Sequence, residues 1–358
     1  MYKPILLCFI VLLAAFTSAR SQSDHEKAEE LLNDAIYLMD DGDPDTAIEM
    51  LREAKKLDPG KSIYDYEIGL AYYYKKDIKK SIEVYKAVVK YDDVTDQCYQ
   101  MLGNMYDISG DRKKALKAYK KGLSLFPNSG RLHYEQGIIL MDEKKYDEAI
   151  SMFELGISKE PNYASNYYQV AKLFLNSSEK MWGMIYGEIF MNLERNTSRT
   201  VEISKLLYVT YLSQITFPTD TTTLKIDLSR GIILNNPKDV ESLKLPYSFV
   251  YVPTLLVSLT TIRELNLSTL NQLRTNFVNN YYAFKHHEKY PNILIEYQNY
   301  LIKMNYMEAY NYWILMMGDE EGFNQWQEDH QEYWREFMNW FPDNGLYIGN
   351  NNSFYRNK

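Results

Sequence analysis

The sequence contains little of what several common protein classes require. Only 2 cysteines, 16 glycines and 11 prolines occur among 358 residues. So few cysteines exclude a fold held together by disulfides, and so few glycines and prolines disfavour a chain rich in hairpins or β–α crossovers. The 40 Lys and Arg residues against 48 Asp and Glu residues give a net charge of −8, the wrong sign for neutralising phosphates. We therefore expect an all-helical protein that does not bind nucleic acid.

Signatures of catalysis and of metal binding are also missing. The 5 histidines are scattered, and no HExxH, GxSxG or Walker-type glycine loop is present. His286, His287 and Glu288 are adjacent, but successive residues of a helix point about 100° apart, and no third ligand accompanies them. We predict no catalytic residue, no metal site and no cofactor.

The longest apolar run lies near the N-terminus, from Ile5 to Phe16, and follows Lys3. It is shorter than the roughly 20 residues that cross a bilayer, and small residues follow it. Such a segment is typical of a signal peptide over residues 1–21, with cleavage after Ala19 or Ser21. We expect no transmembrane segment and an exported protein of a bacterium, which is periplasmic, envelope-associated or secreted.

A repeat of 34 residues organises the next part of the chain. Five windows, 28–61, 62–95, 96–129, 130–163 and 164–197, share small residues at two positions. The eighth positions hold Ala35, Gly69, Gly103, Gly137 and Ala171, and the twentieth positions hold Ala47, Ser81, Ala115, Ala149 and Gly183. The twenty-fourth positions of the first four windows hold Leu51, Tyr85, Tyr119 and Phe153. Small residues at fixed places allow two helices to approach closely.

This pattern resembles the tetratricopeptide repeat, a helix–turn–helix unit. The resemblance implies an all-α solenoid in which each helix pair buries its apolar face against the next pair. It also implies that a protein or peptide partner binds to the first helices of the units, at positions two, five, nine, twelve and thirteen. From these positions we select a partner-binding groove of Tyr66, Tyr73, Gln100, Asn104, Tyr134, Ile138, Tyr168 and Asn176. Arg131 and Lys172 are the only cations there in units two to five, which disfavours capture of a partner's C-terminal carboxylate.

The repeat fades beyond residue 197. A helix over 200–215 resembles the start of a sixth, degenerate unit over 198–236, with a Thr-rich loop at 217–223 and a second helix at 224–234. Prolines at 237, 246 and 253 indicate a junction over 237–253. We recognise no family in the region 254–344, and expect helices there over 255–262, 268–284, 292–304, 306–317 and 320–341. The tail, residues 345–358, is expected to be mobile.

The last of these predicted helices carries aromatic residues at steps of three and four. They are Phe323, Trp326, His330, Tyr333, Phe337 and Trp340. We interpret this stripe as a packing face that covers its neighbours or the end of the solenoid, with a partner-binding helix as the alternative.

The hypothesis for the whole chain is an exported, non-enzymatic scaffold or adaptor that binds a protein partner. Two alternatives stay open. One is a peptide- or glycan-binding protein of the envelope, and the other is an enzyme whose site lies between the solenoid and the C-terminal region.

Overall fold

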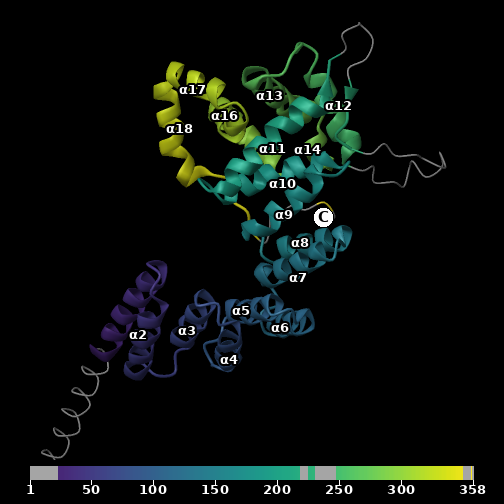
Figure 1. Cartoon of the computed structure of the whole chain (residues 1–358). Coiled ribbons are helices and arrows are strands. Elements are labelled where there is room, and N and C mark those ends of the chain that lie inside the picture. Colours follow the sequence, from purple (N-terminus) through teal and green to yellow (C-terminus); the bar gives the residue numbers. More distant parts are fainter. Residues whose placement is uncertain (1–22, 218–224, 230–246, 350–355, 357–358) are drawn as a thin grey trace, which may run out of the picture. The chain divides into compact units, whose positions relative to one another are not determined.

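The computed structural model describes residues 23–217, 225–229, 247–349 and 356. The predicted signal peptide and most of the predicted junction lie outside these residues. Contacts divide the chain into two compact units, Met1–Ile139 and Leu140–Lys358, and the division falls within helix α7. The described elements are almost all α-helices (Figure 1). The predicted fold class, an all-α solenoid of helical repeats followed by further helices, is confirmed.

The first unit is a series of helices joined by short turns. A helix over 23–40 precedes α2 (Pro44–Leu57), α3 (Ser62–Tyr74), α4 (Ile78–Val88), α5 (Asp96–Ile108), α6 (Arg112–Leu125) and the start of α7 (Gly130–Asp142). The helices α3, α5 and α7 begin at intervals of 34 residues, and so do α2, α4 and α6. The helices thus follow the period of the sequence.

The turns between paired helices repeat the same chemistry. Gly42, Lys76 and Gly110 adopt a left-handed backbone with φ of 90°, 61° and 87°. The aspartate that follows each of them accepts a hydrogen bond from an amide of the next helix; the pairs are Asp43 with Thr46, Asp77 with Lys80 and Asp111 with Lys114. A left-handed residue ends one helix, and an aspartate caps the start of the next. The sequence analysis missed this periodic pair of signals.

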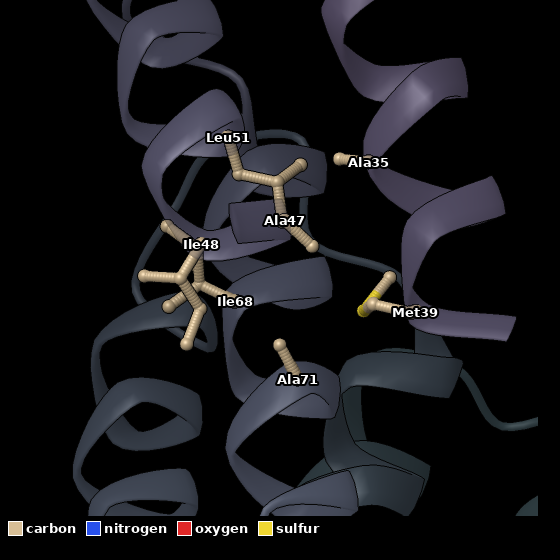
Figure 2. Close-up of a cluster of buried hydrophobic side chains, with 7 residues drawn as sticks. All are labelled: Ala35, Met39, Ala47, Ile48, Leu51, Ile68 and Ala71. Atoms are coloured by element: carbon tan, nitrogen blue, oxygen red, sulfur yellow. The ribbon is translucent and has the colours of Figure 1, made fainter. Parts of the chain in front are cut away.

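Each pair of helices buries its apolar face against the next helix, as the first core cluster shows (Figure 2). The cluster joins the helix 23–40, α2 and α3, and consists of Ala35, Met39, Ala47, Ile48, Leu51, Ile68 and Ala71. A second cluster contains Cys98, which is buried. Stacking of this kind leaves no helix pair with a complete core of its own.

The small residues at the eighth position make room for the ring at the twenty-fourth position of the same unit. A Cβ atom at Gly69 would lie 2.7 Å from the Tyr85 ring, and one at Gly103 would lie 2.0 Å from the Tyr119 ring. The twentieth position approaches the same site, since the Ser81 hydroxyl donates to the Gly69 carbonyl at 2.7 Å. The helices of one unit can therefore pack only when these positions stay small.

The second unit continues the repeat and then adds further helices. Its repeat part holds the end of α7, α8 (Tyr146–Lys159), α9 (Ala164–Leu175), α10 (Lys180–Leu193) and α11 (Ser198–Gln214). The rest holds α12 (Ser248–Ser258), α13 (Leu267–Ala283), α14 (His286–Lys289), α15 (Ile293–Lys303), α16 (Met307–Leu315), a 3-10 turn (Met316–Gly318), α17 (Glu320–Asp329) and α18 (Gln331–Asn344).

Helix α10 is the centre of the second unit. Every residue from Met181 to Asn192 is buried, because α9, α11 and α15 all contact this helix. A helix covered on all sides has no polar face. This explains why the second helix of the fifth repeat departs from the amphipathic pattern of the earlier units.

Two expectations for the region after α11 are corrected. Ile215–Thr216 (β1) pairs antiparallel with Lys225–Ile226 (β2). Because the chain is extended at 225–226, the helix expected over 224–234 does not begin there. Residues 230–234 lie outside the described part. Helix α12 begins at Ser248 and includes Pro253, a residue of the expected junction. Its buried residues Val250, Tyr251 and Leu255 hold it in place, and tertiary packing outweighs the local cost of the proline.

The aromatic stripe lies on two helices, not on one continuous helix over 320–341. The break is at His330, with φ −126° and ψ 33°. The His330 ring nitrogen Nδ1 lies 2.8 Å from the Trp326 carbonyl and satisfies that carbonyl where the helix ends. The stripe packs within its own unit, since Trp326 stacks on Tyr312 with ring centroids 4.1 Å apart.

The tail also differs from the expectation of a mobile segment. Leu346 and Ile348 are 7% and 3% exposed. The backbone amide of Arg356 donates to the Tyr186 hydroxyl at 2.7 Å, and its guanidinium lies 3.4 Å from the Glu154 carboxylate. The described residues of the tail therefore pack on the second unit.

Candidate partner-binding surface

The predicted groove residues at the fifth position connect consecutive first helices. Three of the four contact the second position of the next unit, 31 residues later: Gln97 donates to the Tyr66 hydroxyl at 2.7 Å, Arg131 donates to the Gln100 side-chain oxygen at 3.1 Å, and the Arg199 guanidinium lies 5.0 Å from the Tyr168 ring centroid. Tyr66 and Tyr168 are each 8% exposed. Their rings have little surface left for a partner.

The other predicted groove residues lie in different surroundings. Asn104 accepts a hydrogen bond from the Tyr119 hydroxyl at 2.6 Å. Tyr134 and Ile138 are half-buried on α7, and Asn176 is exposed, with its amide donating to the Lys172 carbonyl at 2.9 Å. Tyr73 is 37% exposed. Of the eight residues, Tyr73 offers the largest aromatic surface to solvent.

Exposed apolar side chains gather at groove positions of the first unit. We call the set Ile36, Ile63, Tyr73, Tyr74 and Ile108 the α3 surface, because three of its five members lie on α3. Their exposures are 37%, 39%, 37%, 47% and 53%. Ile63 is at position two of its unit, Ile36 at position nine and Tyr73 at position twelve, and both Tyr74 and Ile108 are at position thirteen. These positions lie on one face of a helix. Apart from Tyr73 the sequence analysis did not select them, although their positions were available.

Glu67 lies within the α3 surface. It is four residues after Ile63 and seven before Tyr74, so the three side chains lie on one face of α3. The side chain is 9% exposed, and burial raises the pKa of its carboxyl group to about 7. Sequence reasoning missed Glu67 because it occupies the sixth position, outside the five positions that the family pattern indicates.

Glu135 is the equivalent residue two units later, and its surroundings are polar. The Gln100 side-chain amide donates to it at 2.5 Å and the Asn104 amide at 3.5 Å. Burial raises the pKa of Glu135, and these two hydrogen bonds oppose the rise. Glu135 therefore belongs to a hydrogen-bonded network between first helices, whereas Glu67 has no such support.

The second unit contains a buried ion pair between Glu188 of α10 and Arg274 of α13. Their side chains are each 5% exposed and are joined by two hydrogen bonds of 2.6 and 2.9 Å. Gln298 donates to Glu188 at 2.6 Å, and Arg274 donates to Asn311 at 2.6 Å. Burial lowers the pKa of Arg274, because it disfavours the charged guanidinium. The negative charge of Glu188 has the opposite and larger effect, so the pKa of Arg274 is raised. The network links the repeat helices of this unit to its C-terminal helices.

A small pocket beside this ion pair is lined by both charged residues and by apolar side chains, including Tyr251 and Phe277. It has room for roughly one water molecule, which is too little for a substrate. In the part of the chain that the structure describes, no three His, Cys, Asp or Glu side chains meet as a metal site would need. The same residues include no helix that is long and apolar enough to cross a membrane.

Comparisons with known proteins agree with the geometry of the first unit. Two models of the tetratricopeptide repeat match residues 32–93 and 96–129. The Hsp70-Hsp90 organising protein of Plasmodium falciparum is 28% identical over 76 residues, a stretch that covers 21% of this chain and 14% of that protein. The similarity thus spans a small part of that relative.

Solved structures are similar at lower identity. The structure of Pseudomonas aeruginosa PilF is 17% identical, covers 53% of this chain and 86% of its own, and has a TM-score of 0.43. A TPR protein of Thermus thermophilus is 16% identical, covers 50% of this chain and 98% of its own, and has a TM-score of 0.42. The two family models and the 34-residue period of the helices lead to the conclusion that residues 32–129 of this chain are a segment of the tetratricopeptide repeat family.

Proposed function

We propose that this protein is an exported, non-enzymatic interaction scaffold whose first unit binds a segment of a partner protein on the α3 surface. The observation that carries the proposal is the exposure of five large apolar side chains at groove positions of consecutive first helices. Large apolar groups gathered on one face are typical of protein–protein interfaces. The family supports the same function, and the Plasmodium relative is by its name an organiser of two other proteins.

The arrangement of polar residues also supports binding to the α3 surface over the wider predicted groove. Around Gln100 and Glu135, hydrogen bonds between neighbouring helices occupy the polar side chains. Around Tyr73 and Tyr74, the rings lie 5.9 Å apart and both are exposed. Tyrosine rings combine a large apolar area with one hydroxyl, the combination that is enriched where proteins bind one another.

The test of binding is capture of partners from the native cell by the full-length protein, with cross-linking and mass spectrometry. Tyr74→Ser removes a half-exposed ring and should leave the fold intact, while the yield of the captured partner falls by about ten-fold, as expected for an interface aromatic. Tyr146→Ser is the matched control, because Tyr146 is 50% exposed but begins the second helix α8. Equal capture by wild type and Tyr74→Ser would contradict binding at the α3 surface.

Export rests on residues 1–21 and has a separate test. A tagged protein that lacks residues 2–21 should remain in the cytoplasm, whereas the full-length protein should be found in the periplasmic or envelope fraction. If both forms fractionate identically, the N-terminal segment is not an export signal, and the binding proposal is unaffected.

A further inference from the structure

We propose that Glu67 is the anchor for a lysine or arginine side chain of the partner segment that binds the α3 surface. This inference rests on the proposed function and specifies the chemistry of its partner: a segment with one basic residue flanked by apolar residues. Three observations on Glu67 carry it, namely its register, its lack of a partner within the described residues and its apolar surroundings.

The register of the repeat explains why Glu67 has no internal partner among the described residues. Glu135 receives hydrogen bonds from Gln100 and Asn104, which occupy positions five and nine of the preceding unit. The residues two units earlier at these positions are Leu32 and Ile36. Neither side chain can donate a hydrogen bond. The carboxylate of Glu135 therefore receives hydrogen bonds from the preceding unit, whereas the carboxylate of Glu67 receives none from the equivalent positions.

The carboxylate of Glu67 reaches the surface despite its burial. Within the described residues it forms no hydrogen bond and no ion pair, and neither carboxylate oxygen is fully buried. The exposed 9% of the residue therefore includes the carboxylate. The nearby Tyr85 hydroxyl is buried and also lacks a hydrogen-bond partner in the described part of the chain. The structure thus places a solvent-accessible carboxylate near a buried hydroxyl, and neither group has a hydrogen-bond partner within the described residues.

A cationic side chain fits these surroundings. An ionised carboxylate that is largely removed from water is costly unless it is paired, and a lysine or arginine supplies a charge-assisted hydrogen bond to it. The long stems of these side chains can pack on neighbouring apolar groups such as Ile36, Ile63 and Tyr74. A partner's acidic residue would be repelled. One isolated carboxylate offers too few ligands to hold a metal ion.

The experiment selects short synthetic peptides on the immobilised full-length protein. All peptides in the library have apolar residues around a central position, which is lysine, arginine, norleucine or glutamate. We expect wild type to enrich lysine and arginine over norleucine by about ten-fold, the effect of one desolvated charge pair. Glu67→Gln should abolish this preference. Glu83→Gln is the matched control, because it removes the same charge from the second helix α4, and it should keep the preference.

Each outcome decides the proposal. If wild type and Glu67→Gln enrich lysine and norleucine peptides equally, Glu67 is not an anchor; the proposed function then survives if Tyr74→Ser lowers retention of all peptides. If no peptide is retained, the anchor is overturned and the proposed function is judged by the capture of native partners alone. A double-mutant cycle with individual peptides completes the test. The loss of binding free energy from Glu67→Gln and the loss from replacing the peptide's lysine by norleucine should not add.

Discussion

Replacing Glu67 with glutamine should stabilise the first unit at neutral and alkaline pH. Burial raises the pKa of Glu67 from its ordinary value of 4.5 to about 7, so the folded state holds this proton more tightly than the unfolded state does. Between about pH 4.5 and 7 the folded state binds more protons, and stability falls as the pH rises through this window. At 1.36 kcal/mol for each pKa unit, ionised Glu67 lowers the free energy of unfolding by about 3 kcal/mol above pH 7.

The assay is urea unfolding at a series of pH values, followed by two signals. All five tryptophans lie between Leu140 and Lys358, so their fluorescence reports the second unit, and far-UV circular dichroism reports both. The free energy of unfolding of the first unit should be the same for Glu67→Gln and wild type near pH 4.5, and higher for Glu67→Gln by about 3 kcal/mol at pH 8. Glu83→Gln controls for the loss of one charge. Parallel curves for wild type and Glu67→Gln across this range would refute the desolvation of Glu67, and with it the anchor proposed above.

Two further substitutions, one in each unit, test the packing of the helices. Gly103→Ala places a Cβ atom 2.0 Å from the Tyr119 ring and should destabilise the first unit by about 1–3 kcal/mol; an unchanged circular dichroism transition in urea would show that the ring moves aside freely. Arg274→Ala leaves the Glu188 carboxylate buried without its counterion and should cost the second unit about 3–5 kcal/mol, measured by tryptophan fluorescence. A loss below about 1 kcal/mol there would mean that water reaches Glu188.

The partner surface could be predicted only in part from the sequence. The family pattern indicates which positions of each first helix face a partner, and the selection of Tyr73 rests on that pattern. It does not distinguish Tyr66, whose ring is buried and hydrogen-bonded to Gln97, from Tyr74, whose ring is exposed. Exposure depends on which residues the neighbouring helix brings to the same place, and one repeat seen alone does not contain that information.

The sequence by itself determined the helical repeat, because its signals are local and periodic. Small residues at Gly69 and Gly103, large rings at Tyr85 and Tyr119, and a period of 34 are sufficient to define the repeat and the faces that its helices bury. Stability in such an array comes from contacts between neighbours in the chain, so a reading along the sequence captures most of it.

Tertiary structure alone decided the features that depend on residues far apart in the chain. Arg274 pairs with Glu188 across 86 residues, and the helix over 320–341 divides at His330 as its aromatic rings pack against α16. The unpaired state of Glu67 within the described residues is also of this kind, because it depends on what the preceding unit presents to it. The physical reason is that burial and pairing are properties of a site in space, whereas periodicity is a property of the chain.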